Sequence, residues 1–235
     1  MRYENHMTET STCSLACILI SIVILFSGCS QKSLPYDNGP VMSQKNIDKT
    51  FAPILQFMDY RPGMSFADVG AGSGALTIMM ASLMDSSDVY IQDIDTTVLK
   101  KTNLNRIIDY YSKQGGRDLR LNNRFTLAIG DVQKTNLPEE HFDLIYSNGT
   151  AHNFTSLDSM VTDLSRKLKP EGVLYFRDSF KNDHGQGDFC SDPKCGRPLL
   201  TIDEFLSAMR RNGFEVKKQS ADMSGYPVFG FTLMR

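Results

Sequence analysis

Residues 65–84 constrain the fold most, because they combine a short apolar run, a turn of alternate glycines and a helical pattern. The run at residues 65–69 predicts a buried strand, and residues 75–84 predict a helix. Between them, the glycines allow the backbone to turn sharply and to approach a ligand without interference from a Cβ atom. A strand, a glycine turn and a helix in this order are typical of open α/β sheets that bind ligands at the carboxyl ends of their strands.

Strand-like and helix-like patterns alternate along the rest of the chain. Further strands are predicted at residues 89–92, 125–129, 142–146 and, after a break at Lys169-Pro170, 172–176. Further helices are predicted at residues 47–58, 104–111, 157–168 and 201–213, the last with a capping box of Thr201 and Glu204. This alternation predicts an α/β fold with a Rossmann-like, mostly parallel sheet and helices on both faces.

The end of the chain departs from that alternation. Two strand-like runs at residues 214–218 and 228–234 lie too close together for a crossover helix. They must therefore pair antiparallel as a C-terminal hairpin, which gives a predicted sheet of seven strands. The chain has 235 residues and a net charge of −2, so no strong field recruits nucleic acid. We expect no nucleic-acid partner, and the sequence leaves the oligomeric state open.

A separate signal precedes the predicted domain. Residues 14–28 carry no charge and are fewer than the roughly 20 needed for a membrane-spanning helix, but they fit the apolar region of a signal peptide. Residues 25–29 (LFSGC) resemble the lipobox of bacterial lipoproteins, in which the peptide is cut before the cysteine and the thiol is lipidated. This predicts lipidation at Cys29 and a domain on the periplasmic or cell-surface side. The alternative is an uncleaved inner-membrane anchor with a cytoplasmic domain.

These patterns predict three parts: a signal peptide at residues 1–28, a lipid-anchored polar tether at 29–46 and a folded domain at 47–235. Cleavage would remove two of the five cysteines and lipid would cap a third, which leaves Cys190 and Cys195. In an oxidising compartment these two would form a disulfide. The alternatives are two unpaired thiols or a zinc site that includes His184. Because zinc needs four ligands and only His184 is near the two cysteines, no metal site is predicted.

Asp68 lies two residues before the first glycine, at the end of a strand that should be buried. A carboxylate there needs a partner, because an unpaired buried charge is costly. It would repel a pyrophosphate but suit a cationic ligand. The glycines alone, read as G-x-G-x-x-A from Gly70 to Ala75, also fit a dinucleotide fingerprint. An NAD-dependent oxidoreductase is therefore an alternative, although the chain has no separate substrate domain.

The stretch at residues 66–74 (FADVGAGSG) resembles motif I of the class I S-adenosylmethionine-dependent methyltransferases. Residues 89–93, 130–132, 142–148 and 168–172 resemble later segments of this family in the same order. The resemblance implies S-adenosylmethionine as cofactor, with ribose hydroxyls on Asp93 and the adenine amine on Asp131. The cofactor-binding residues it implies are Asp68, Gly70, Gly72, Gly74, Asp93, Ile94, Asp131, Val132 and Asn148. The alternatives are a plain glycine turn, and capping roles for Asp93 and Asp131.

His152 stands where this family places acceptor-side residues, and its imidazole could act as a general base. Hydrogen bonding to its surroundings alone is the other interpretation, and Asp178 and His184 are weaker candidates. The family's Asn-Pro-Pro-aromatic signature is absent at residues 148–151, which favours a small-molecule acceptor. An exported domain would not be expected to meet S-adenosylmethionine. The alternative function is therefore an exported, non-catalytic ligand-binding module on a methyltransferase fold.

Overall fold

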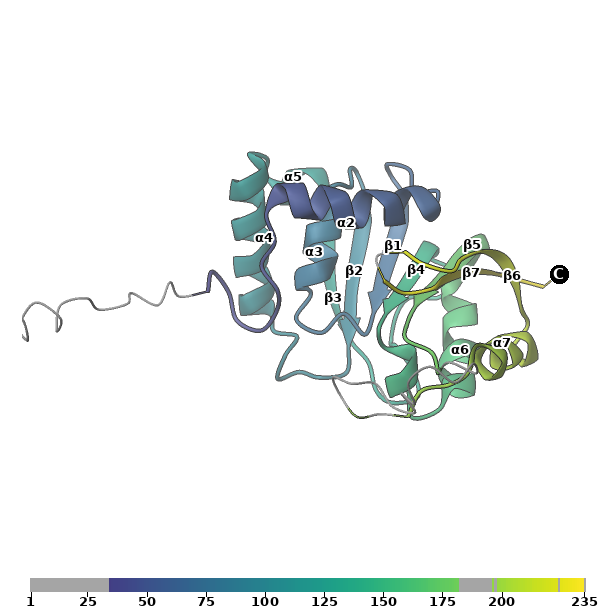
Figure 1. Cartoon of the computed structure of the whole chain (residues 1–235). Helices are drawn as coiled ribbons and strands as arrows, with labels where there is room; N and C mark the ends of the chain where they lie inside the picture. The colour runs from purple at the N-terminus through teal and green to yellow at the C-terminus, as the bar shows by residue number, and fades with distance from the viewer. Residues whose placement is uncertain (1–33, 182–195, 197, 224, 235) are drawn as a thin grey trace, which may run out of the picture. The chain divides into compact units, whose positions relative to one another are not determined.

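A seven-stranded sheet in the order β3-β2-β1-β4-β5-β7-β6 forms the centre of the protein (Figure 1). The computed structural model describes residues 34–181, 196, 198–223 and 225–234. Strands β1 to β5 run parallel, whereas β7 pairs antiparallel with both β5 and β6. The strands are β1 Ser65–Val69, β2 Asp88–Asp93, β3 Arg124–Ile129, β4 Phe142–Asn148, β5 Leu168–Arg177, β6 Phe214–Ser220 and β7 Val228–Leu233. The predicted fold class and hairpin are confirmed.

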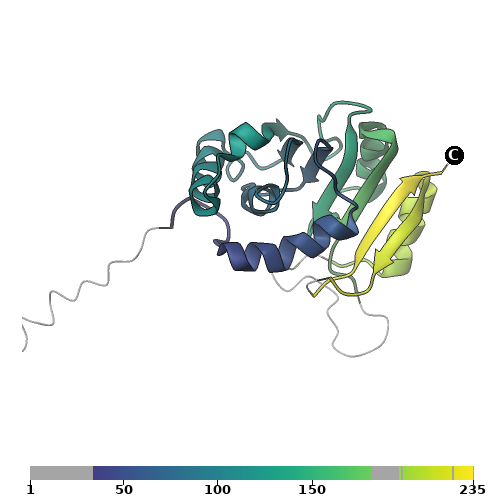
Figure 2. The same ribbon diagram turned by 90° about the horizontal axis from the view of Figure 1, so that it is seen from above.

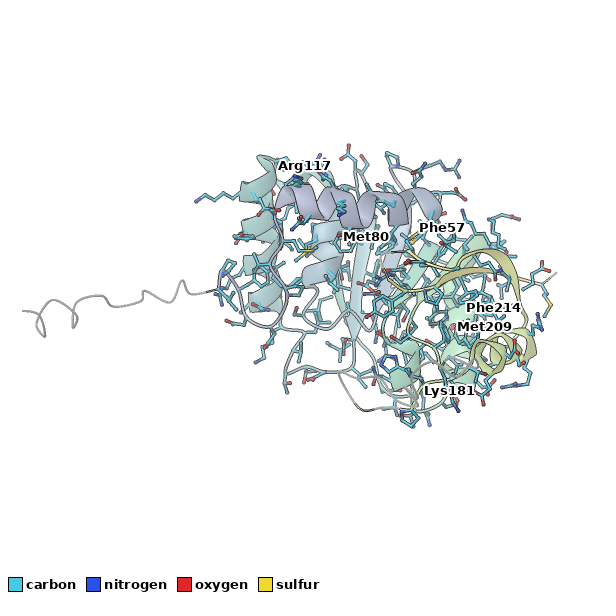
Figure 3. The ribbon with its side chains drawn as sticks, viewed as in Figure 1. Phe57, Met80, Arg117, Lys181, Met209 and Phe214 are labelled. Carbon is cyan, nitrogen blue, oxygen red and sulfur yellow. The ribbon has the colours of Figure 1, made fainter. Side chains whose placement is uncertain are left out.

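Helices cover both faces of this sheet, as the view from above shows (Figure 2). The helices are α2 Gln44–Phe57, α3 Ala75–Ala81, α4 Lys101–Gly115, α5 Leu119–Asn122, the 3₁₀ helix η1 Ala151–Asn153, α6 Leu157–Lys167 and α7 Ile202–Arg211. Two apolar clusters separate along these layers: α2, α3 and α4 bury residues such as Met80 on one face, and α6 and α7 bury Met209 on the other (Figure 3). Successive side chains of each strand point to opposite faces, so alternate strand residues belong to one cluster or the other. This is the pattern expected for a sheet covered on both faces.

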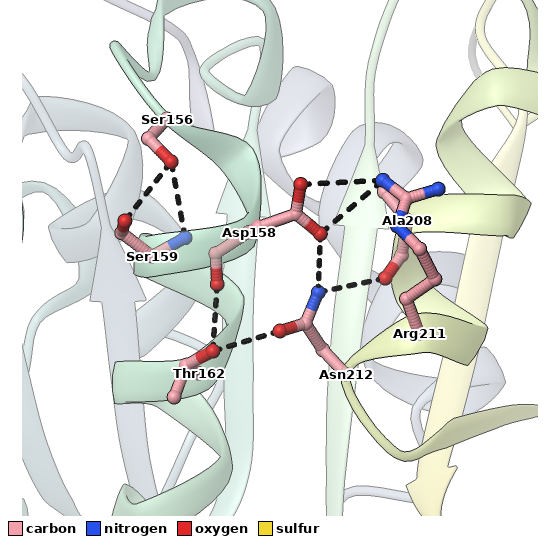
Figure 4. A network of polar contacts seen from close by, with 7 residues as sticks. All are labelled: Ser156, Asp158, Ser159, Thr162, Ala208, Arg211 and Asn212. Atoms are coloured by element: carbon pink, nitrogen blue, oxygen red, sulfur yellow. Dashed lines mark hydrogen bonds and ion pairs between the residues drawn. The ribbon is translucent and has the colours of Figure 1, made fainter.

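The last helix is held by polar contacts as well as by its apolar side. Asn212 Nδ2 donates to Asp158 Oδ1 at 2.6 Å, and Arg211 Nη2 lies 3.2 Å from Asp158 Oδ2 (Figure 4). Thr162 Oγ1 lies 2.7 Å from Asn212 Oδ1. The predicted capping box is present, since Glu204 N donates to Thr201 Oγ1 and Thr201 N donates to the Glu204 carboxylate. These contacts fix α7 against α6 beside the C-terminal hairpin.

Residues 35–46 belong to the folded unit, so the prediction of a tether is wrong for this part of residues 29–46. Tyr36 is 1% exposed, and its hydroxyl lies 2.9 Å from that of Tyr111 on α4. Asp37 N donates to Asn103 Oδ1 at 2.8 Å, and Asn103 Nδ2 donates back to Asp37 O at 2.6 Å. One buried aromatic residue and the side chain of Asn103 thus give a polar, aperiodic segment a fixed place, and α2 already begins at Gln44.

The break predicted at Lys169-Pro170 does not end the strand, because β5 is continuous from Leu168, but the pairing of β5 with β4 is interrupted at these residues. Leu168 pairs with Phe142 and the next paired residue, Val173, faces Leu144, so Pro170, which has no N–H to donate, lies in a stretch without register partners on β4. Helix α3 ends at Ala81, three residues before the predicted end, and the short helices α5 and η1 were not predicted.

Several predictions concern residues outside the described ranges. These are the signal peptide at residues 1–28, the lipidation of Cys29, the disulfide of Cys190 and Cys195, and the role of His184. Among the helices that the structure describes, none has the length and apolar character needed to span a membrane. Within the same described residues, no group of three or more potential ligands could hold a metal ion.

Candidate functional site

A cavity of about 310 Å³ lies at the carboxyl ends of β1, β2 and β4. Its volume falls within the range of roughly 300–1,000 Å³ that is usual for small-molecule sites. The chain reverses direction across the sheet between β1 and β4, which is where open α/β sheets bind ligands. The cavity is lined by Gly70, Gln92, Asp93, Ile94, Asp131, Val132, Asn148, Gly149, Thr150, Asn153, Phe154, Thr155 and Met160. Six of the nine predicted cofactor residues are therefore brought together here.

A larger hollow of about 860 Å³ lies elsewhere, between α4, α5 and the edge strand β3. It includes Asp88 and Arg124 at the amino ends of β2 and β3, and none of the predicted site residues lines it. Asp88 is occupied there by two bonds from the Arg124 guanidinium, at 2.6 and 2.9 Å. Volume alone would favour this hollow, but position in the fold and chemistry favour the smaller cavity.

The glycine turn brings β1 close to the loop after β4. Gly70 has a φ of +77°, and a Cβ atom built on it would lie 2.2 Å from Thr150 Cγ2. Gly74, with a φ of +80°, precedes α3, and its added Cβ atom would lie 2.9 Å from Leu104 Cδ1. A side chain at either position would therefore displace a neighbour and strain the backbone. The turn can take this path only with glycine at these two residues.

Asp68 lies beneath the turn, at the end of β1, and is 5% exposed. Thr77 Oγ1 on α3 donates to Asp68 Oδ2 at 2.6 Å, so the carboxylate has the partner that the sequence analysis required. Burial raises the pKa of Asp68 to about 7, with a smaller contribution from the charge of Asp93. Asp68 does not line the cavity itself, so it would act on a bound cation through its charge or a bridging water.

Asp93 ends β2, and both of its carboxylate oxygens accept hydrogen bonds from backbone amides. Its Oδ2 accepts from Gly72 N at 2.7 Å, and its Oδ1 accepts from Ile94 N at 2.7 Å and Asp95 N at 2.9 Å. A carboxylate offers about four lone-pair positions, of which three are used here. The carboxylate can thus accept about one more hydrogen bond, and a second hydroxyl donor would have to replace one amide.

Asp131 combines the capping role with a place in the cavity wall. Its Oδ1 accepts from Gln133 N at 2.8 Å and from Lys134 N at 3.0 Å, and these backbone bonds lower the pKa of Asp131. The carboxylate therefore stays ionised and acts only as an acceptor, which suits an N–H donor. Ile94 and Val132 are each 48% exposed beside the two acids, so the cavity offers apolar side chains to a flat ring.

The loop after β4 supplies residues that the sequence analysis missed. Thr150, Asn153 and Phe154 all line the cavity, on or next to η1. Asn148 Oδ1 accepts from Arg177 Nη1 at 2.8 Å, which fixes the predicted residue at the end of β4. The nearness of Thr150 and Asn153 to His152 was the only available signal, because Phe154 and Met160 resemble core residues in the sequence.

His152 lies beside the cavity rather than in its wall. Its Nδ1 is 2.7 Å from Asp178 Oδ1, and the two side chains are 6% and 2% exposed. The structure thus pairs the predicted base with a second candidate that the sequence analysis ranked lower. Thr150 and Asn153, on either side of His152, do line the cavity.

Comparison with known proteins agrees with this geometry. Residues 67–176 match the family model described as a methyltransferase domain. The ubiquinone/menaquinone biosynthesis C-methyltransferase UbiE of Shewanella sp. (strain W3-18-1) is 29% identical over 127 residues, which cover 53% of this chain and 46% of that protein. The arsenite methyltransferase of Aquipseudomonas alcaligenes is 26% identical over 199 residues, covering 79% and 55%. The chain spans about half the length of these curated relatives.

Solved structures share the fold at low sequence identity. A SAM-dependent methyltransferase from Aquifex aeolicus matches with a TM-score of 0.57 and 16% identity, covering 83% of this chain and all of that one. The cyclase SpnF matches with a TM-score of 0.60 and 15% identity, covering 85% and 86%. At these identities the likeness concerns the fold alone.

Proposed function

We propose that this chain, which carries a class I S-adenosylmethionine-dependent methyltransferase domain, transfers the methyl group of that cofactor to a small-molecule acceptor. The observation that carries the proposal is the cavity at the carboxyl ends of β1, β2 and β4, with a glycine turn and two carboxylates in its wall. The names of the two relatives support a small acceptor, since one concerns quinone biosynthesis and the other arsenite. The net charge of −2 agrees with it.

The residues of the cavity fit this cofactor. Its sulfonium and ammonium groups are cationic, and Asp93 and Asp131 line the cavity while Asp68 lies buried beneath it. The Thr150 side chain fills the place where a Gly70 side chain would stand, so glycine lets the turn and the loop after β4 meet closely in the cavity wall. Asp93 would accept a ribose hydroxyl, Asp131 would accept from the adenine amine, and Ile94 and Val132 would cover the adenine ring.

When bound, the cofactor supplies an electrophilic methyl group, so the chain's own task is mainly to orient and desolvate the reactants. Asp93 holds Gly72 N and thereby fixes the turn against β2. Asn148, held by Arg177, and Thr150 form the wall between the turn and the acceptor side. His152 stands as the proposed base where the acceptor must lose a proton.

Isothermal titration of the purified chain with S-adenosylmethionine and with S-adenosylhomocysteine tests this function. We expect both to bind, and Asp93→Ala to weaken binding by about 10- to 150-fold, as for the loss of a hydrogen bond to a charged group. Asp109→Ala is the matched control, because Asp109 on α4 is an exposed acid that pairs with Arg120 on α5, away from the cavity. A folded chain that gives no heat with either compound would support the non-catalytic binding module instead.

We further propose, from residues 14–29, that the chain is a lipoprotein attached through Cys29. The support is the uncharged apolar stretch and the small residues before the cysteine. Membrane fractionation and gel mobility of Cys29→Ala test it, and both should change relative to the unmodified chain. Unchanged fractionation and mobility would refute lipidation and favour the uncleaved anchor or a chain without one.

A further inference from the structure

Asp178, directly after β5, is one of the most buried acids of the described chain and collects three donors. Its Oδ2 accepts from Ala151 N at 2.7 Å. Its Oδ1 accepts from Ser179 N at 2.7 Å and lies 2.7 Å from Nδ1 of His152. The carboxylate is 2% exposed, so these bonds are made where water competes little. Asp178 therefore fixes both the start of η1 and the plane of the imidazole ring.

This arrangement determines which imidazole nitrogen carries the proton. A carboxylate only accepts hydrogen bonds, so Nδ1 of the neutral ring must be the donor. The lone pair then lies on Nε2, and Nδ2 of Asn153 is 3.1 Å from that atom, in the position of a donor. Asp178 thus selects the tautomer in which Nε2 can accept a proton.

The Nε2 edge of the imidazole lies next to a residue of the cavity wall. Asn153, whose side chain approaches Nε2, lines the cavity and is itself exposed. An acceptor with an O–H or C–H bond would present a donor to Nε2 in the way that the Asn153 amide does. Displacing an exposed amide from a hydrogen bond is a small perturbation, because water can satisfy the amide afterwards.

We propose that Asp178 is the positioning residue of a His152 general base, and that the acceptor is therefore a molecule whose attacking atom loses a proton, a hydroxyl or an acidic C–H. The inference rests on the proposed methyl transfer. The acceptor's X–H proton passes to Nε2 while its electron pair forms the bond to the methyl carbon, and the sulfur keeps the electrons of the broken S–CH₃ bond. Asp178 balances the charge of the resulting imidazolium, which later releases its proton to water.

The acceptor class follows from the presence of an oriented base. A nucleophile that attacks through an existing lone pair, without losing a proton, requires no base. A structural role alone would require only the two backbone bonds of Asp178, from Ala151 and Ser179. The pairing with the imidazole goes beyond those two bonds, and it orients Nε2 beside Asn153 of the cavity wall.

The tautomer can be measured without turnover. The chain has four histidines, so a ¹H–¹⁵N long-range correlation spectrum of the whole chain resolves each ring, and His152→Ala assigns the signals. We expect His152 to carry its proton on Nδ1, and Asp178→Asn to reverse this, because the new amide would donate to Nδ1. A proton on Nε2 in the unmodified chain, or an unchanged tautomer in Asp178→Asn, overturns the assignment.

Turnover tests the base and the acceptor class. With phenols of graded acidity as probes, Asp178→Asn and His152→Ala should each lower kcat by about 10²- to 10⁴-fold, the usual contribution of general-base catalysis. The loss should shrink with thiophenol, which is already ionised at pH 8, and cofactor affinity should not change. Asp163→Asn is the control, since the Asp163 side chain is only 12% exposed and accepts from Thr135, but it does not line the cavity.

Three outcomes would refute the inference. Equal losses for phenols and thiophenol would indicate a structural role. A similar loss in Asp163→Asn would indicate general destabilisation. Methylation of arsenite or dimethyl sulfide by the unmodified chain, with none of the phenols or of acetylacetone, would overturn the acceptor class. A chain that binds no cofactor would instead refute the proposed function, while the tautomer measurement would still decide the pairing.

Discussion

The buried Asp68 makes the stability of the ligand-free chain depend on pH in an unusual direction. Its pKa is raised by burial from 3.8 to about 7, so the folded state keeps a proton that the unfolded chain has lost over this interval. Stability therefore falls as pH rises from about 4 to 7. The shift is about three units, and at 1.36 kcal/mol per unit it corresponds to about 4 kcal/mol.

Asp68→Asn removes this effect, because an amide does not ionise and can still accept from Thr77. We expect the variant and the unmodified chain to unfold in urea with similar free energies at pH 4. At pH 8 the variant should be more stable by up to about 4 kcal/mol. Thr77→Val should act in the opposite direction, since the Thr77 hydroxyl stabilises the ionised carboxylate. Parallel pH profiles for the unmodified chain and Asp68→Asn would refute the reasoning.

Other perturbations test the cavity and the fold. Gly70→Ala should weaken cofactor binding measured by titration, because its Cβ atom would lie 2.2 Å from Thr150 Cγ2; unchanged affinity would place the ligand elsewhere. Tyr36→Phe should lower the free energy of urea unfolding by about 1–2 kcal/mol, because the Tyr36 hydroxyl contacts both Pro40 O and the Tyr111 hydroxyl; an unchanged free energy would show that these contacts do not hold residues 35–46 in the folded unit. Ile94→Ser should lower cofactor affinity without changing stability, since Ile94 is 48% exposed in the ligand-free chain; a matching loss of stability would contradict its role as a ligand contact.

The sequence predicts those parts of the molecule that depend on local patterns. Strands and helices follow from periodicity, and the turn at Gly70 follows from a residue type that tolerates its backbone angle. The acids at the ends of β1 and β2 come together because parallel strands align their carboxyl ends, as the pairing of Asp68 with Ile91 shows. No tertiary information is needed for any of these inferences.

The remaining features depend on packing between distant segments, which periodicity does not report. Tyr36 reads as part of a polar linker, yet it meets Tyr111 across 75 positions of sequence. Phe154 and Met160 read as core residues, and Met160 is indeed only 3% exposed, yet both also line the cavity. Pro170 reads as the end of an element, but it lies within β5, between Leu168 and Val173, where the pairing with β4 is interrupted. In each case the outcome is set by a neighbour that lies far away in the chain.

Asp93 and Asp131 show why capping and ligand binding should not be treated as alternatives. Both acids accept bonds from backbone amides of their own loops, as a cap would. Both nevertheless line the cavity. The amide bonds hold each carboxylate in one orientation, and at Asp131 they also lower the pKa of the carboxyl, which suits an amine donor. At these two strand ends the capping bonds are therefore compatible with the proposed binding role, and a capping pattern does not argue against it.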